Sequence, residues 1–250
     1  MTLNGRNALV TGGTRGIGRA IVLALAEAGA NVVTCYRQES DAVDLLRKEL
    51  AVTAGEHHVL KADVGEQAEL AEFVRAAAAH LGTVDIVVHN AGAITHVPFD
   101  KLSLEGWNRV VDTNLTAAFQ LTQEVIPALS ESASIIYVGS KVAMVGVPMR
   151  AHYTAAKAGM VGLARSLSKE LGARGIRVNV VAPGIIDTSD PDRMPPEEYN
   201  AMQERLDAYR KRVPLGRLGR SEDIAAAVLF LSGDGAAFIN GETLNVDGGM

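Results

Sequence analysis

The amino-acid sequence predicts an α/β fold, a single doubly wound parallel sheet of about seven strands with helices on both faces. Short β-branched segments alternate along the chain with segments of helical period, which is the pattern of repeated strand–helix–strand units. Several strand segments are apolar on consecutive residues, as strands covered on both faces must be. No repeat, low-complexity tract or linker divides the 250 residues, so we expect a single domain over residues 1–250.

Strands are predicted where β-branched and apolar residues cluster, and helices where apolar residues recur with helical period. The helix that begins at Ile17 should end before Gly29, because glycine is a common C-terminal stop. Ser221, followed by Glu222 and Asp223, is typical of an N-terminal cap. The expected strands are 8–11, 31–36, 58–61, 85–89, 134–138, 177–181 and 243–246, and the expected helices are 17–28, 40–50, 67–80, 105–130, 152–172 and 221–231.

One segment, 185–212, interrupts this alternation. It has no strand signal, contains Pro191, Pro195 and Pro196, and ends in a charged stretch that is predicted to be helical. A connection this long in a compact domain is usually functional or disordered. Because it follows the carboxyl end of a strand, where ligands bind in open α/β sheets, we interpret it as a substrate lid. The alternative is an inert surface excursion.

Composition and charge exclude several classes of function. Apolar residues make up 48% of the chain and charged residues 21%, as in ordinary globular proteins. The formal net charge of −5 argues against nucleic acid or an anionic membrane as the main partner. The apolar runs are too short for a bilayer, no export signal is visible, and the single Cys35 offers no metal-ligand spacing. We therefore expect a cytoplasmic protein without a metal site.

A glycine-rich loop lies between the first predicted strand and the first predicted helix. Its spacing is G-x3-G-x-G, which differs from the general G-x-G-x-x-G pattern. We therefore base the interpretation of this loop on its position between a strand and a helix. This position indicates a dinucleotide whose phosphates bind backbone amides at the helix N-terminus. The expected contacts are Gly12, Thr14, Arg15, Gly16, Ile17 and Gly18.

The end of the second predicted strand indicates which dinucleotide binds. A ribose 2′-hydroxyl calls for an acidic residue there, whereas a 2′-phosphate calls for arginine. No acidic residue stands at this strand end, where Arg37 follows the strand 31–36, and Arg15 could converge with Arg37 on one phosphate. Glu39 is the alternative ribose ligand, although it is better placed in the first turn of the next helix. The charge pattern favours NADP(H) over NAD(H).

Two later strand ends complete the predicted cofactor site. Asp63 and Val64 follow the third strand, where they are expected to hold the adenine. Asn90, Ala91 and Gly92 follow the fourth strand, and the small residues among them allow the backbone to approach the cofactor closely.

Tyr153 and Lys157 lie four residues apart in a predicted helix, so their side chains share one face. A free tyrosine titrates near ~10, and a nearby ammonium lowers that pKa. Ser140 follows the strand 134–138, where its hydroxyl would hydrogen-bond the carbonyl oxygen that Tyr153 protonates. Tyr-x3-Lys alone is typical of a surface helix pair. Together with Ser140 and the glycine loop, it indicates acid–base catalysis.

From the glycine loop to residues 247–249, the chain resembles a short-chain dehydrogenase/reductase, a family with a Rossmann-type fold. The resemblance implies an active enzyme that transfers hydride from the nicotinamide C4 of NADPH to a ketone. It implies that Lys157 binds the nicotinamide ribose and that Asn114 holds a water linking Lys157 to solvent. The implied catalytic residues are Asn114, Ser140, Tyr153 and Lys157, and those at the nicotinamide end are Pro183, Gly184, Ile186 and Thr188.

Within that family, the runs 179–184, 214–217 and 241–244 resemble 3-oxoacyl-[acyl-carrier-protein] reductases. Those reductases commonly carry basic residues where this chain has 129–134, which contains none, and Arg174 alone remains to dock an acidic carrier protein. We therefore favour a polycyclic ketone, as reduced by the tailoring enzymes of aromatic, angucycline-type polyketide pathways in antibiotic biosynthesis. The expected substrate contacts are Ser140, Val142, Met144, Val147, Met149, Tyr153 and Met194.

Alternatives stay open. A 3-oxoacyl-[acyl-carrier-protein] reductase is the first, and a regulator that binds NADP(H) without turnover is the second, although such regulators typically lose Tyr or Lys. The apolar residues around Ser140 could also be ordinary core packing.

The resemblance implies a homotetramer with helices 105–130 and 152–172 between subunits. For His57, His58 and His152 we expect surface or packing roles.

Overall fold

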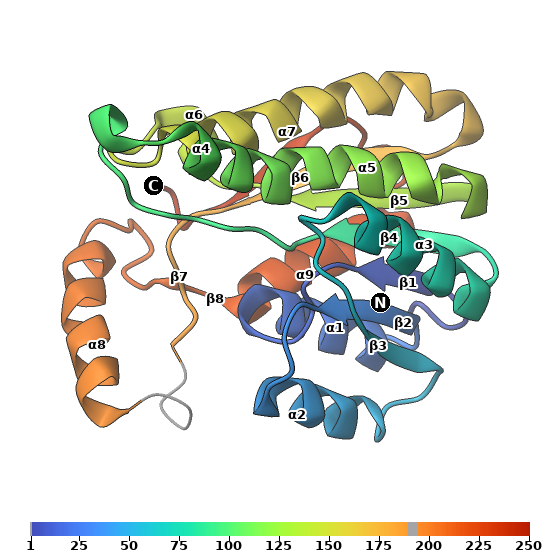
Figure 1. Cartoon of the computed structure of the whole chain (residues 1–250). Coiled ribbons are helices and arrows are strands. Elements are labelled where there is room, and N and C mark those ends of the chain that lie inside the picture. Colours follow the sequence, from blue (N-terminus) through green and yellow to red (C-terminus); the bar gives the residue numbers. More distant parts are fainter. Residues whose placement is uncertain (1, 190–194) are drawn as a thin grey trace.

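The computed structural model describes residues 2–189 and 195–250, and seven parallel strands form its main sheet (Figure 1). The strand order is β3-β2-β1-β4-β5-β6-β9, so the predicted doubly wound α/β fold is confirmed. The strands are β1 (Asn7–Val10), β2 (Asn31–Tyr36), β3 (His57–Lys61), β4 (Val84–His89), β5 (Leu129–Val138), β6 (Arg177–Pro183) and β9 (Thr243–Val246). A separate two-stranded sheet pairs β7 (Ile186–Asp187) with β8 (Gly219–Arg220).

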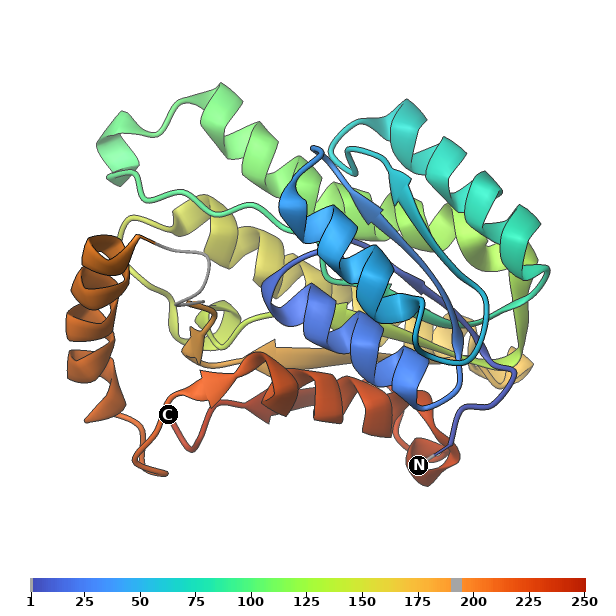
Figure 2. The same cartoon turned by 90° about the horizontal axis from the view of Figure 1, so that it is seen from below.

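Helices cover both faces of the main sheet (Figures 1 and 2). They are α1 (Gly16–Glu27), α2 (Asp41–Leu50), α3 (Gln67–Leu81), α4 (Leu104–Val111), α5 (Ala117–Val125), α6 (Val142–Val145), α7 (Ala151–Glu170), α8 (Pro196–Arg210) and α9 (Ser221–Ser232). One apolar core packs α3, α5 and α7 against the sheet, and a second packs α1, α2 and α9 against the other face. Among the described helices, none is both long and apolar enough to span a membrane.

The strand order places a crevice at the carboxyl end of the sheet. β1 lies between β2 and β4. The strands β2 and β3 are added on one side of β1, and the strands from β4 onward are added on its other side. In open α/β sheets ligands bind at such a switch point, beyond the carboxyl ends of the strands. The glycine loop after β1 and the segment 90–92 after β4 therefore meet at the expected cofactor site.

The prediction of one helix over 105–130 was wrong in two ways. A π-helical turn, Asp112–Thr116, separates α4 from α5, and a 3-10 turn, Ile126–Ala128, ends the helical segment before β5 begins at Leu129. Proline lacks the backbone N–H that would continue the helical hydrogen bonds, so Pro127 explains the early end. The π-helical turn carries Asn114.

Two smaller predictions were also corrected. The N-cap of α9 is Arg220, not Ser221, and the Asp223 carboxylate accepts the Arg220 backbone N–H at 2.7 Å. The segment 185–212 does contain a strand, because β7 pairs with β8, while its charged part forms α8 as predicted. Met194, an expected substrate contact, lies outside the described residues.

Candidate active site

The glycine loop has the conformation that a dinucleotide phosphate requires. Gly12 and Gly16 adopt φ values of +68° and +52°, which side chains disfavour. A Cβ at Gly18 would collide with the Gly12 carbonyl oxygen. The first turn of α1 has no acidic residue, and its N-cap, Arg15, makes no capping hydrogen bond through its side chain. The amides of this helix N-terminus are therefore suited to an anion.

The segment after β4 holds this loop in place. The Asn90 amide donates to the carbonyl oxygens of Thr11 and Gly12, at 3.2 and 3.0 Å. The Thr11 hydroxyl accepts the backbone N–H groups of Asn90 and Ala91, both at 3.1 Å. A Cβ at Gly12 would lie 3.0 Å from the Ala91 Cα, so the two backbones approach closely. The predicted elements meet, and together they fit a dinucleotide.

The charged residues near the end of β2 differ in how far they are engaged by other protein groups. Arg37 has 66% of its side chain exposed, and its Nε lies 4.0 Å from an Asp63 carboxylate oxygen. Glu39 accepts a hydrogen bond from the Tyr36 hydroxyl, which also accepts one from Arg47 at 3.4 Å. Glu39 is thus engaged within the protein, whereas the Arg37 guanidinium extends into solvent.

Asp63 and Val64 lie just beyond β3. The Asp63 carboxylate accepts the Gly65 N–H at 2.9 Å, and Val64 is buried in the core. Nothing tests the expected contact of this pair with adenine, which stays a prediction.

Ser140, Tyr153 and Lys157 come together at the carboxyl end of β5. The Ser140 hydroxyl accepts the Val142 N–H at 3.2 Å, and it lies close enough to the Tyr153 oxygen to lower the pKa of the phenol. Lys157 Nζ lies 5.6 Å from the centre of the Tyr153 ring. The Lys157 ammonium donates to the Val138 carbonyl oxygen at 2.8 Å, which ties α7 to the end of β5. The predicted trio therefore shares one site.

The electrostatics of this trio differ from the expectation. Burial lowers the pKa of Lys157 to about 7. The pKa of Tyr153 is raised by burial, against the opposing effects of the Ser140 hydrogen bond and the positive charge of Arg150. The expected lowering of the tyrosine pKa by Lys157 is therefore not observed. The physical reason is that the buried lysine loses its charge at a pH well below that at which the phenol ionises.

Asn114 lies beside Lys157, as expected, on the π-helical turn. Its amide donates to the carbonyl oxygens of Ala93 and Val110, at 2.7 and 2.8 Å. Its Oδ1 is buried and accepts no hydrogen bond from the described residues. A Cβ at Gly92 would lie 2.6 Å from this oxygen and 3.7 Å from Lys157 Nζ, so only glycine leaves room here. This unsatisfied acceptor fits the predicted role in a water-mediated relay.

His89, the last residue of β4, was not predicted as a site residue. Its Nε2 donates to the Asn114 carbonyl oxygen at 3.1 Å, and its Nδ1 lies 3.3 Å from the Thr11 hydroxyl. Burial, assisted by the charge of Lys157, lowers the pKa of His89 to about 3, so the ring is neutral. His89 thus links the strand that precedes the glycine loop to Asn114. A histidine directly before Asn90, at the end of a buried strand, was the available signal.

Arg150 and His96, which were not predicted either, join the loop after β4 to the start of α7. Arg150 Nε and Nη2 lie 2.8 and 2.6 Å from His96 Nε2. Next to them, the Thr95 hydroxyl lies 2.6 Å from Nε2 of the buried His152, which confirms the expected packing role of His152.

The expected substrate wall lies along α6 and the loop before α7. Met144 and Met149 have 49% and 47% of their surface exposed, and Val142 and Val147 are partly exposed. Ordinary core packing, the alternative for these residues, is therefore wrong. Their contact with a substrate stays a prediction.

Residues after β6 also reach this edge of the sheet. The Pro183 carbonyl oxygen accepts the Lys141 N–H at 2.9 Å, and Gly184 packs against Asp247, which pairs with Lys141 at 2.7 Å. The side chain of Thr188 would lie 3.6 Å from a Cβ at Gly16, so the start of the predicted lid lies close to the glycine loop. Ile186 packs against the apolar core.

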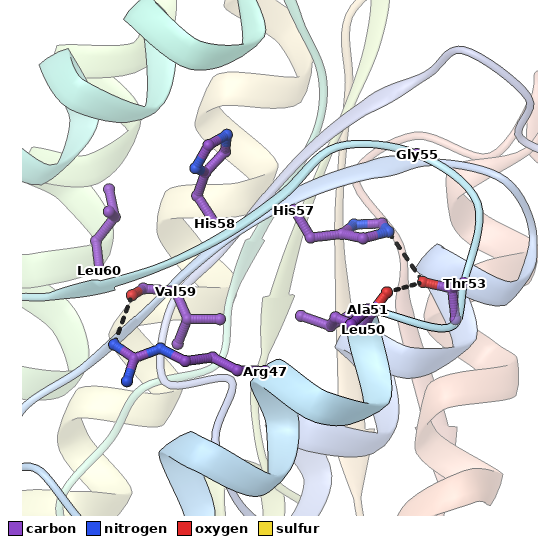
Figure 3. Close-up of a pocket in the computed structure, with 9 residues that line it drawn as sticks. All are labelled: Arg47, Leu50, Ala51, Thr53, Gly55, His57, His58, Val59 and Leu60. Carbon is purple, nitrogen blue, oxygen red and sulfur yellow. Dashed lines mark hydrogen bonds between the residues drawn. The ribbon is translucent and has the colours of Figure 1, made fainter.

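A cavity lies away from the candidate active site, between α2 and β3 (Figure 3). His57 lines it and lies 2.9 Å from the Thr53 hydroxyl, while the neighbouring His58 points away and stacks on His80. Arg47 donates to the Val59 carbonyl oxygen at 3.5 Å. These contacts agree with the structural roles expected for His57 and His58.

Comparisons with known proteins cover the whole chain. A family model described as enoyl-(acyl carrier protein) reductase matches residues 12–250. The 3-oxoacyl-[acyl-carrier-protein] reductase FabG of Escherichia coli K12 is 40% identical over 252 residues, covering 100% of this chain and 99% of the relative. FabG of Staphylococcus epidermidis is 38% identical over 248 residues, covering 98% of each.

Solved structures agree with these relatives. A short-chain dehydrogenase/reductase from Serratia marcescens BCRC 10948 superposes with a TM-score of 0.90 at 35% identity, covering 100% of this chain and 99% of the other. A blue fluorescent protein from a metagenomic library, solved in complex with NADPH, gives a TM-score of 0.90 at 34% identity with the same coverage. The named relatives support the carrier-protein reductase, which was the alternative, better than the favoured polyketide enzyme.

Proposed function

Because the chain belongs to the short-chain dehydrogenase/reductase family of oxidoreductases, we propose that it is an NADPH-dependent reductase of 3-oxoacyl thioesters. The observation that carries this proposal is the convergence of Tyr153, the buried Lys157 and the nearby Ser140 hydroxyl, with Lys157 Nζ 5.6 Å from the centre of the Tyr153 ring. A phenol and a hydroxyl that meet in this way can both bind one carbonyl oxygen.

The residues present divide the reduction of a ketone among them. The nicotinamide, when bound, supplies a hydride from C4 to the ketone carbon. The Ser140 hydroxyl donates a hydrogen bond to the carbonyl oxygen, and Tyr153 gives its proton to that oxygen, so the product is a secondary alcohol. Lys157 binds the nicotinamide ribose and, with Asn114, returns a proton to Tyr153.

The preference for NADPH is supported by the residues that follow β2. Arg37 is exposed beyond the strand and Arg15 is exposed on the glycine loop, so both guanidinium groups are available to a 2′-phosphate. Glu39 is the residue that would bind a ribose 2′-hydroxyl, and it is engaged by Tyr36. One solved relative was crystallised with NADPH.

The substrate class is supported by the relatives that share nearly the full length of the chain and bear the name 3-oxoacyl-[acyl-carrier-protein] reductase. The 3-oxoacyl group would arrive as a thioester, with an acyl carrier protein as its carrier. Arg174, on the turn that follows α7, is an exposed cation that could dock such a carrier. A polycyclic aromatic ketone is the second candidate substrate, because the half-exposed Met144 and Met149 offer an apolar surface.

We further propose that the active form is a homotetramer. Leu104 on α4 and Phe119 on α5 have 73% and 48% of their surface exposed, which favours burial of these helices against a second copy. Sedimentation analysis of the purified protein tests this assembly, and a monomer at micromolar concentration contradicts it.

Absorbance at 340 nm tests the reductase directly. The protein should oxidise NADPH in the presence of the acetoacetyl thioester of N-acetylcysteamine, and the 3-hydroxy product should be recovered. The fused-ring ketone 1-tetralone, offered in parallel, tests the second candidate. Tight NADPH binding without turnover of either ketone contradicts both and favours a regulator that binds the cofactor without catalysis.

A further inference from the structure

Arg150 lies at the start of α7, about one helical turn before Tyr153. It is the N-cap of α7, and side chains three positions apart at a helix start lie on the same side of the helix. The backbone around it is tied to the loop after β4, because the Val97 N–H donates to the Met149 carbonyl oxygen at 2.9 Å. The guanidinium and the Tyr153 phenol therefore belong to one side of the site.

A neutral partner holds this guanidinium. Nε and Nη2 of Arg150 both donate to His96 Nε2, at 2.8 and 2.6 Å. Arginine has no acceptor, so these two contacts require His96 Nε2 to accept, as it does in the tautomer that carries its proton on Nδ1. Among the residues that the structure describes, none places a carboxylate within ion-pair distance of Arg150. His96 thus positions the charge without cancelling it.

The charge of Arg150 reaches the reacting groups. It opposes the rise that burial causes in the pKa of Tyr153, so guanidinium and phenol interact through space. Lys157, on the following turn of α7, is the other basic group beside Tyr153. Basic side chains therefore flank the phenol on both sides, and this arrangement favours an electron-rich ligand with more than one oxygen.

We propose that Arg150, held by His96, is a substrate subsite that binds the second oxygen of a 1,3-dicarbonyl compound. Ser140 and Tyr153 hold the ketone oxygen, and the free N–H groups of Arg150 donate to the thioester carbonyl oxygen two carbons away. A simple ketone lacks this second acceptor, so Arg150 selects 3-oxo thioesters against it. The subsite rests on the proposed function, since it concerns the same site and names the group that the site recognises.

Paired ligands separate recognition from structure. The first is the acetoacetyl thioester of N-acetylcysteamine, and the second is the same molecule with its thioester carbonyl replaced by CH2. Their Kd values are measured by calorimetry on the protein saturated with NADP+, which cannot reduce either ketone. R150M should raise the Kd of the thioester about 10-fold or more, the usual effect of losing a hydrogen bond to a charged group. It should change the Kd of the monoketone less than about 2-fold.

Two further variants, R150K and R75M, are compared with R150M. R150K keeps the charge but loses the planar fork, so its loss for the thioester should be intermediate. R75M removes an exposed arginine on α3 and should change neither Kd. The Kd of NADP+ should be unchanged in all three variants. If R150M folds poorly, the ratio of the two ligand affinities in R150K still reports on recognition, because only folded protein binds.

The outcomes are distinguishable. Equal losses for both ligands in R150M and R150K, or no loss for either, overturn the subsite and leave Arg150 a structural link between α7 and the loop after β4. A wild-type protein that does not oxidise NADPH with the acetoacetyl thioester overturns the proposed function instead. A wild-type protein that reduces this thioester but binds both ligands equally well overturns the subsite alone.

Discussion

The Lys157 ammonium donates a hydrogen bond to the carbonyl oxygen of Val138, at 2.8 Å, inside the protein. This contact fixes the lysine at the junction of β5 and α7, next to Tyr153, at the cost of removing an ammonium from water. The consequence is a pKa of about 7 for Lys157, caused by burial. Lys157 is therefore a group whose charge changes near neutral pH.

This burial predicts a pH-dependent effect on stability. Lys157 has a folded-state pKa of about 7 against a model value of 10.5, so between these values the unfolded chain binds the extra proton. Its destabilising effect is complete below pH 7 and disappears as the pH rises towards 10.5. We expect K157M to be more stable than the wild type at pH 6, by about 1 kcal/mol or more, with the difference shrinking by pH 9.5.

Urea unfolding at fixed protein concentration measures this difference. L163M, a substitution of a partly buried apolar residue on the same helix, serves as the control and should show no such trend with pH. A stability difference for K157M that is constant from pH 6 to 9.5 contradicts the lowered pKa.

Replacement of Tyr153 tests the proton donor. Y153F removes the hydroxyl that gives its proton to the ketone oxygen and keeps the ring against its neighbours. We expect reduction to fall by about 100-fold or more, the usual size of acid–base catalysis, while the Kd of NADPH stays within about 2-fold. Absorbance at 340 nm and quenching of protein fluorescence report the two quantities. Turnover at the wild-type rate would remove Tyr153 from this role.

Arg37 and Arg15 test the choice of cofactor. R37A should weaken NADPH binding about 10-fold or more, and R15A/R37A further, while NADH binding changes little, because only NADPH carries the 2′-phosphate. E39Q is the matched variant, since it removes the alternative ribose ligand and should leave both affinities nearly unchanged. Equal losses for both cofactors in R37A, or a selective loss of NADH in E39Q, argue for the acidic alternative.

His89 should make stability depend on pH in the acid range. Its folded-state pKa is about 3 against a model value of 6.5, so the unfolded chain binds the extra proton between these values. The stability that neutral His89 provides is therefore present above pH 6.5 and is lost as the pH falls towards 3. H89N should unfold with a weaker dependence on pH between 7 and 5 in urea titrations, and its kcat should fall because Asn114 loses a contact. An unchanged pH dependence contradicts the buried neutral histidine.

The sequence predicted the sheet well because its strands are short, apolar and separated by helices of clear period. It predicted that Ser140, Tyr153 and Lys157 lie together, because Tyr153 and Lys157 share one face of a helix and Ser140 follows a strand end. It failed at Ile126, where the apolar period continues and Pro127 alone marks the end of the helix. The π-helical turn at Asn114 has no composition signal, since it depends on packing between helices.

His96 and Arg150 were missed for a different reason. They lie 54 positions apart and meet only because the loop after β4 crosses the start of α7. Periodicity reports which residues share a face of one element, and it does not report which loops meet. The raised pKa of Tyr153 was missed likewise, because burial outweighs the neighbouring charges and burial is a property of the folded chain.

The anchoring of α8 gives a test of the predicted lid. The Gln203 amide donates to the Ser189 hydroxyl at 2.8 Å and to the Asp187 carboxylate at 3.2 Å, joining α8 to the chain that leaves β7. Figures 1 and 2 show α8 standing beside the main body of the fold, and Leu206 of α8 packs with Val213 and Leu218 in a small apolar cluster. Q203A removes both hydrogen bonds and should raise the KM for the thioester about 5-fold, with the Kd of NADPH unchanged.

E204A, an exposed neighbour on the same helix, is the control for a general effect on α8 and should leave the KM unchanged. A deletion within 195–212 should enlarge the effect of Q203A on the substrate while sparing the cofactor. If Q203A and the deletion both weaken NADPH as much as they weaken the thioester, the segment supports the cofactor site and is not a substrate lid. If neither affects the KM, it is the inert excursion that the sequence left open.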